Sequence, residues 1–276
     1  VNGEVKDEQK FTDILGEWFT KEKKKLPSPF VAISLPEEKS FIRVAQIPHV
    51  KHEDIANAVR WEIENQIPLS VNDVIYDYEV IGPLPNTQDH LDIVITAFPR
   101  DILNAYIRAI THAGMRLYAI ELEVQSLVRA CISSFNDMEA SIIVDIGRTR
   151  TSLVIFAAGA ILYTSTIDIG GIAFEYGLSK QLGIKQEEAE KIKIDIGLNK
   201  MEKGGEVFNA LAPMVAIIAD ELTRAISYYQ THATHVQHHA TPMIQQVLLT
   251  GGEANLLGLD TYLTHVLKIH VECADP

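Results

Sequence analysis

The chain has 276 residues, of which 47% are hydrophobic and 22% charged, a balance typical of a folded globular protein with one large domain or two ordinary ones. Its formal net charge of −13 argues against a nucleic-acid partner, because binding to a phosphate backbone depends on clustered Lys and Arg. Two cysteines, Cys131 and Cys273, match no disulfide or metal spacing and indicate a reducing compartment such as the cytoplasm.

Helix and strand signals alternate over the first 114 residues. Apolar residues spaced as one helix face predict an amphipathic helix near the N-terminus, and apolar residues at every fourth position predict a second helix that ends at Pro68. The expected elements are a helix with Phe11, Ile14, Leu15 and Trp18 on its apolar face, strands 30–35 and 41–47, a helix 52–67, strands 74–81 and 91–98, and a helix 100–113. We interpret residues 37–114 as a compact inserted subdomain.

The second part of the chain mixes clusters of strands with helices, which predicts an α/β architecture with mixed sheets. The expected strands are 117–122, 142–144, 153–156, 160–169, 247–250 and 269–273, and the expected helices are 124–132, 173–182, 187–193 and 207–229.

Residues 141–156 predict a hairpin whose tip presents backbone N–H groups and small hydroxyl side chains. Oriented amides suit phosphate oxygens, and Asp145 beside them suits a hydrated magnesium ion, which usually meets only one or two carboxylates. Taken alone, the pattern also describes an ordinary hairpin with a bulge.

Two glycine pairs follow the hairpin, each at the end of an apolar strand: Gly170–Gly171 and Gly251–Gly252. A glycine pair lets a ligand approach the backbone closely, although either pair alone also fits a tight turn. Between them, Glu190 and Lys193 share one helical face and could reach ribose hydroxyls, or could simply lie on a solvated helix face.

The order of four motifs, VDIG at 144–147, IGG at 169–171, AEKIK at 189–193 and LTGGEANLLGL at 249–259, resembles the actin-like ATPase superfamily. Within it, the Trp61 helix running into Ile67–Pro68, the strand around Tyr76 to Tyr78 and the run from Glu221 to Tyr229 resemble the PilM family of type IV pilus assembly proteins, relatives of FtsA. The resemblance implies an actin-like fold with two lobes and a small inserted α+β subdomain, truncated at both ends. Residues 1–36 and 115–140 would belong to the first lobe, 37–114 to the inserted subdomain and 141–276 to the second lobe.

The resemblance also implies ATP and Mg²⁺ as ligands. Asp145 takes the place of the acid that holds the magnesium ion through water, and Glu123 takes the place of a residue that positions an attacking water. The implied nucleotide contacts are Gly147, Thr149 and Thr151 of the second phosphate loop, Gly170 and Gly171, Glu190 and Lys193 on the ribose side, and Gly251, Gly252 and Asn255 of the adenosine motif. The first phosphate loop is expected upstream of Val1 and a closing helix after Pro276, so hydrolysis by this chain is left open.

Three residues depart from the motifs. Arg148 and Arg150 stand where small residues are common, so they either pair with phosphate or crowd it. Glu253 stands where a third glycine is common and places an acid near the expected nucleotide, which is expected to weaken nucleotide binding.

The implied function is that of a cytoplasmic scaffold of the pilus machinery, held at the inner face of the inner membrane through partners. It would dock the cytoplasmic tail of an inner-membrane pilus protein, PilN-like, beside residues 37–114, and contact other pilus assembly proteins or further copies of itself. The alternatives are a phosphotransferase of the same superfamily, such as a sugar kinase, and a structural remnant that binds partners without nucleotide.

Other patterns give weaker hypotheses. His232, His235 and His239 could hold a metal if their helix continues, and Glu121 with Glu123 could form the carboxylate pair of a hydrolase. Trp61 is expected to pack in a core.

Overall fold

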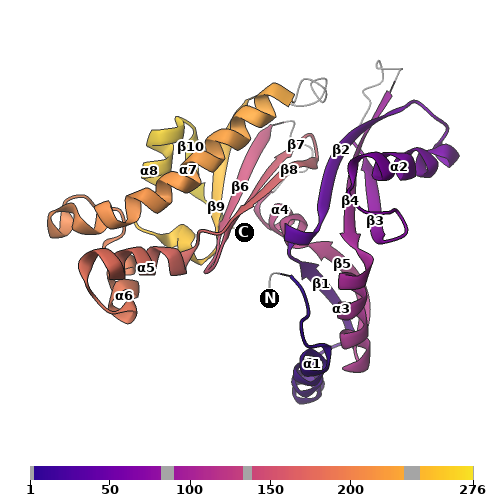
Figure 1. Cartoon of the computed structure of the whole chain (residues 1–276), viewed down its shortest axis with the longest axis horizontal. Coiled ribbons are helices and arrows are strands. Elements are labelled where there is room, and N and C mark those ends of the chain that lie inside the picture. Colours follow the sequence, from indigo (N-terminus) through magenta and orange to yellow (C-terminus); the bar gives the residue numbers. More distant parts are fainter. Residues whose placement is uncertain (1–2, 82–89, 133–138, 233–242, 276) are drawn as a thin grey trace. The chain divides into compact units, whose positions relative to one another are not determined.

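The computed structural model describes residues 3–81, 90–132, 139–232 and 243–275. The chain divides into two compact units, Val1–Leu127 and Val128–Pro276, each of which is described by itself (Figure 1). Within the described ranges, no helix is both long and apolar enough to cross a membrane. The predicted helices and strands are confirmed, with bounds that differ by a few residues.

The first unit begins with a layer of two helices on a two-stranded parallel sheet. Its elements are α1 (Glu8–Glu22), β1 (Phe30–Leu35), the short helix η1 (Glu37–Lys39), α3 (Arg100–His112) and β5 (Arg116–Leu122). The core between the helices and the sheet contains Phe19, Ile110 and Met115. In α1 it is Phe19, with Leu15 one turn before it, that faces this core, whereas Ile14 and Trp18 are about half exposed, so the predicted apolar face was only partly right.

The same unit holds a three-stranded antiparallel sheet in the order β2-β4-β3. Its elements are β2 (Phe41–Pro48), α2 (His52–Gln66), β3 (Val74–Val80) and β4 (His90–Pro99). Ile55, Val59 and Ile63 of α2 are buried against the sheet, as the four-residue spacing predicts. Trp61 is 63% exposed, so the expectation that it packs in a core was wrong: two residues from both Val59 and Ile63, it lies on another side of the helix.

The helix α3 follows β4 directly, yet Ile110 belongs to the core of Phe19 and Met115 rather than to the core under α2. Residues within the predicted subdomain 37–114 therefore share a core with residues outside it. The domain boundaries drawn from the sequence stay a prediction. From β5 the chain enters α4 (Glu123–Cys131), which extends from the first unit into the second.

The second unit is built on a five-stranded mixed sheet in the order β10-β9-β6-β7-β8. The strands are β6 (Ala140–Ile146), β7 (Thr151–Ala157), β8 (Ala160–Ile167), β9 (Ile244–Thr250) and β10 (His270–Cys273). Strands β6, β7 and β8 are antiparallel neighbours, whereas β9 pairs in parallel with both β6 and β10. Because β6 and β9 are parallel neighbours, Asp145 and Thr250, the residue before the second glycine pair, lie side by side at the same end of their strands.

Helices cover this sheet (Figure 1). They are α5 (Gly171–Leu182), α6 (Gln186–Ile196), η2 (Glu202–Gly205), α7 (Glu206–His232), η4 (Gly252–Asn255) and α8 (Leu259–Leu267). One face of α7 is fully buried against the sheet at Leu211, Val215 and Leu222. Of the proposed histidine cluster, His232 ends α7 as the structure describes it, and His235 and His239 lie outside the described residues.

Candidate functional site

The turn between β6 and β7 forms the first part of the site. Asp145 is half-buried on β6, opposite Ser152 of β7 and Thr250 of β9. The N–H of Gly147 donates to the carbonyl oxygen of Arg150 at 2.9 Å and closes the turn, which leaves Arg148 and Thr149 exposed at its tip. A carboxylate and an exposed tip therefore lie side by side, as the sequence predicts.

Gly170 and Gly171 hold this turn against the start of α5. The N–H of Gly171 donates to the carbonyl oxygen of Gly147 at 3.1 Å, and the N–H of Ile172 donates to that of Arg148 at 2.9 Å. A Cβ atom at Gly170 would lie 2.6 Å from the carbonyl oxygen of Gly147 and 2.7 Å from the backbone nitrogen of Arg150. Only glycine fits here without moving backbone, so the first glycine pair fixes the shape of the turn.

The second glycine pair reaches the same place from β9. Gly251 has a φ of +85°, and a Cβ atom there would overlap Oδ1 of Asp145 and lie 2.5 Å from the carbonyl oxygen of Ile146. Gly252 is exposed, with nothing within 4 Å of the position that its Cβ would take. Asn255 is also exposed, and its Nδ2 donates to the carbonyl oxygen of Gly252 at 3.4 Å.

Lys193 of α6 completes the cluster. It is 4% exposed, and its Nζ donates to Oε1 of Glu175 at 3.1 Å and to Oε1 of Glu253 at 2.7 Å. Glu175, on α5, is only 1% exposed, and a buried carboxylate is costly unless a charge of opposite sign is paired with it, as Lys193 is here. Nη1 of Arg148 lies 3.6 Å from the same Oε1 of Glu175, so this arginine of the turn tip approaches a carboxylate.

Thr151, Glu190 and Glu123 are the remaining predicted residues. Thr151 is buried, and its hydroxyl donates to the carbonyl oxygen of Ile169 at 2.7 Å, so it ties β7 to the segment before the first glycine pair. Glu190 is exposed on α6, one turn before Lys193. Glu123 is the first residue of α4 and belongs to the first unit, so its position relative to Asp145 is not described.

The charge of Asp145 acts on a thiol within the same unit. Burial raises the pKa of the Cys131 thiol, and the negative charge of Asp145 raises this pKa further. A thiol with a raised pKa carries little thiolate near neutral pH, so Cys131 is expected to react slowly.

Sequence reasoning missed Glu175 and the contact between Glu253 and Lys193. Glu175 follows Phe174 and precedes Leu178, both fully buried, so the one available signal was an acid among apolar residues of the same helix. Glu253 was predicted to place an acid near the nucleotide, but not to pair with Lys193. Nothing in the sequence pairs either acid with Lys193, because the three residues come from three different elements.

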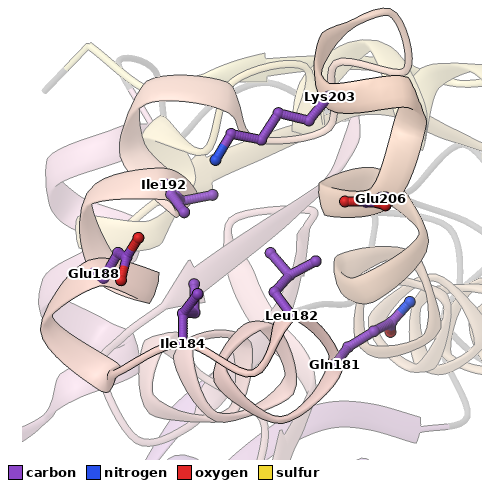
Figure 2. A pocket seen from close by; sticks show the side chains of 7 residues that line it. All are labelled: Gln181, Leu182, Ile184, Glu188, Ile192, Lys203 and Glu206. Carbon is purple, nitrogen blue, oxygen red and sulfur yellow. The ribbon is translucent and has the colours of Figure 1, made fainter.

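A separate pocket of about 390 Å³ lies among α5, α6 and the start of α7. Aliphatic side chains of Leu182, Ile184 and Ile192 form part of its lining, and Figure 2 shows Glu188 and Glu206 on opposite walls. None of the predicted site residues lines this pocket, so it is distinct from the cluster around Asp145.

The chain has the fold of actin-like proteins. A solved structure of the PilM-PilN type IV pilus biogenesis complex matches 100% of this chain and 77% of that chain, with a TM-score of 0.78 and 20% identity. MreB5 of Spiroplasma citri bound to ADP matches 100% of this chain and 73% of its own, with a TM-score of 0.63 and 16% identity. These likenesses confirm the predicted fold.

The family model of the type IV pilus assembly protein PilM matches residues 1–276, and the chain belongs to that family. The cell division protein FtsA of Bacillus subtilis is 23% identical over 264 residues, which cover 88% of this chain and 57% of FtsA. The chain thus spans a little over half the length of FtsA. The resemblance stated from the sequence motifs is confirmed.

Proposed function

We propose that the second unit binds ATP at the cluster around Asp145. The observation that carries this proposal is that three separate glycine signals meet at the turn beside one carboxylate. Gly147 and Gly170 touch across the turn, and Gly251 lies against Asp145, although these residues are far apart in the sequence. This close backbone packing fixes an exposed turn beside Asp145, and the tip of that turn would contact a phosphate chain at this end of the sheet.

The residues fit the two ligands by their chemistry. Asp145 would hold Mg²⁺ through its water shell, and the turn from Gly147 to Thr151 would contact phosphate oxygens. Gly252 and Asn255, both exposed, would border the adenosine. Bound magnesium would supply charge neutralisation for the phosphates, while the chain itself orients the nucleotide.

Titration calorimetry with ATP and Mg²⁺ tests this site. Asp145→Asn should reduce the affinity at least tenfold, because the carboxylate is the proposed partner of the hydrated metal, whereas Asp260→Asn, an exposed acid on α8, should leave it unchanged. Equal affinity for ATP in wild type and Asp145→Asn would remove the proposal.

We further propose that the first unit docks the cytoplasmic tail of a PilN-like inner-membrane pilus protein on residues 37–114. A solved relative is a PilM-PilN complex, and the outer strands β2 and β3 and the face of α2 could each accept a peptide. Trp61, 63% exposed on α2, supports this role, because a large aromatic side chain at the surface is typical of a binding anchor. Through this partner the chain would lie at the cytoplasmic face of the inner membrane.

A peptide-binding measurement compares two exposed aromatic residues. Trp61→Ala should weaken binding of the PilN-like tail by about tenfold or more, in the range of an interface anchor. Tyr176→Ala, which removes a side chain 65% exposed on α5 of the other unit, should not change it. Full binding by Trp61→Ala would exclude the face of α2 as the docking site, and the outer strands β2 and β3 would then be the remaining candidates.

A further inference from the structure

An ion pair with Lys193 holds the side chain of Glu253 over the start of α5. It lies in the short helix η4 directly after the second glycine pair, and its Oε1 accepts from Nζ of Lys193 at 2.7 Å. This is the shorter of the two bonds that Lys193 makes to carboxylates. A charge-assisted bond in a partly buried setting holds the Glu253 side chain firmly in this position.

The carboxylate of Glu253 also lies against Gly171 of the first glycine pair. A Cβ atom at Gly171 would overlap Oε1 of Glu253, lie 2.7 Å from its Cδ and lie 3.2 Å from Nζ of Lys193. The space that glycine opens beside the backbone is therefore taken by an acid of the chain itself. A nucleotide that approaches this backbone would meet a negative charge.

Within the group of four side chains that ion pairs join, the charges balance only because Glu253 is present. Glu175 and Glu253 are negative, Lys193 and Arg148 are positive, and the contacts among them join all four. Without Glu253, one positive charge would remain in excess, and Lys193 would keep Glu175 as a partner. Coulomb attraction for an anion near a partly buried site would then rise.

We propose that Glu253 limits the affinity of this site for nucleoside phosphates by competing with the ligand for Lys193. The inference rests on the proposed nucleotide site. An anionic nucleotide gains Lys193 only by displacing Glu253, so part of its attraction is offset by the loss of the existing ion pair. An uncharged ribose hydroxyl of adenosine can bond to Lys193 without displacing Glu253, because the two bonds to carboxylates use two of the three ammonium donors, so Glu253 has little effect on adenosine.

The test measures binding of ATP with Mg²⁺ and of adenosine, by titration calorimetry, to wild type, Glu253→Gln and Glu253→Ala. Both substitutions should raise the affinity for ATP by about tenfold and change that for adenosine by less than about twofold. Glu187→Gln removes an exposed acid at the start of α6 and serves as the matched change of charge, with no expected effect. Two variants are used because Gln keeps a hydrogen-bond acceptor for Lys193, whereas Ala removes it.

The outcomes separate this inference from the proposed function. If wild type binds ATP and Asp145→Asn does not, but the Glu253 variants bind as wild type does or more weakly, then only the competition is overturned. An equal gain for ATP and adenosine also overturns it, since the effect would then not depend on phosphate charge. If no variant binds ATP, the nucleotide site and the competition fall together.

Discussion

The N–H of Gly171 donates to the carbonyl oxygen of Gly147 at 3.1 Å, so the first residue of α5 is bonded to the turn after β6. Together with the bond from Ile172 to Arg148, this contact uses the first amides of the helix to hold the turn. The start of α5 therefore acts as a clamp on the turn. The shape of the proposed phosphate loop depends on tertiary contacts as well as on its own sequence.

One substitution in each glycine pair should distinguish a closely packed glycine from one that faces open space. Gly170→Ala should destabilise the fold by about 1–3 kcal/mol, because its Cβ would collide with backbone atoms at 2.6 and 2.7 Å. Gly252→Ala should change the free energy of unfolding by less than about 0.5 kcal/mol, since nothing lies within 4 Å of its Cβ position. Urea denaturation measures both, and equal losses would contradict the close packing at Gly170.

Removal of the Lys193 amine should leave the buried Glu175 carboxylate without its closest cation. Lys193→Met should lower the free energy of unfolding by about 3 kcal/mol, because Glu175 is 1% exposed and would lose its closest cation. Lys191→Met, on the exposed face of the same helix, should stay within about 0.5 kcal/mol of wild type.

A double variant checks the cause of that loss. Glu175→Gln combined with Lys193→Met removes both charges and should recover part of the stability lost by Lys193→Met alone. Strictly additive losses in the double variant would show that the two residues do not depend on each other.

The charge of Asp145 should be measurable at Cys131. In a Cys273→Ser background, Asp145→Asn should lower the pKa of Cys131, because the charge that raises it is gone, although burial still keeps it above its ordinary value. Alkylation by iodoacetamide at pH 8 should therefore be faster, since the thiolate is the reactive form. Asp260→Asn is the control, and an unchanged pH profile for Asp145→Asn would mean that the two groups are not coupled.

Glu221 should make the stability of the second unit depend on pH. Burial opposes its ionisation, but the Ser165 hydroxyl at 2.6 Å and the Arg224 guanidinium bring the pKa of Glu221 below its ordinary value of 4.5. A carboxylate with a lowered pKa stabilises the fold above its unfolded pKa, and this contribution is lost as the pH falls through the folded pKa.

The corresponding experiment compares Glu221→Gln with wild type by urea denaturation across pH. Glu221→Gln should be about 1 kcal/mol less stable at pH 7, and the difference should shrink below pH 4.5. Asp220→Asn, at the exposed neighbouring position, should show a smaller difference. A constant difference from pH 7 to pH 3 would contradict the assignment to the charge of Glu221.

Much of the fold followed from local spacing. The four-residue repeat in α2 and the alternation of apolar runs with glycine depend only on neighbouring residues, so they could be read without tertiary contacts. The inward face of α1 could not, because Phe19 and Trp18 are both apolar and only packing against Ile110 and Met115 selects Phe19. Trp61 was misplaced for a different reason: its apolar character suggested a core, although its spacing from Val59 and Ile63 already puts it on another side of α2.

The sequence by itself determined the elements, the positions of the glycines and the family, because each depends on the order and spacing of residue types along the chain. Only the tertiary structure decided that Lys193 is held between Glu175 and Glu253. These partners lie 18 and 60 residues away from it in the chain, and the meeting of three charged side chains depends on how their helices pack. Glycine spacing therefore predicts the backbone turns of the site around Asp145, whereas the pairing of its charged side chains depends on how the helices pack.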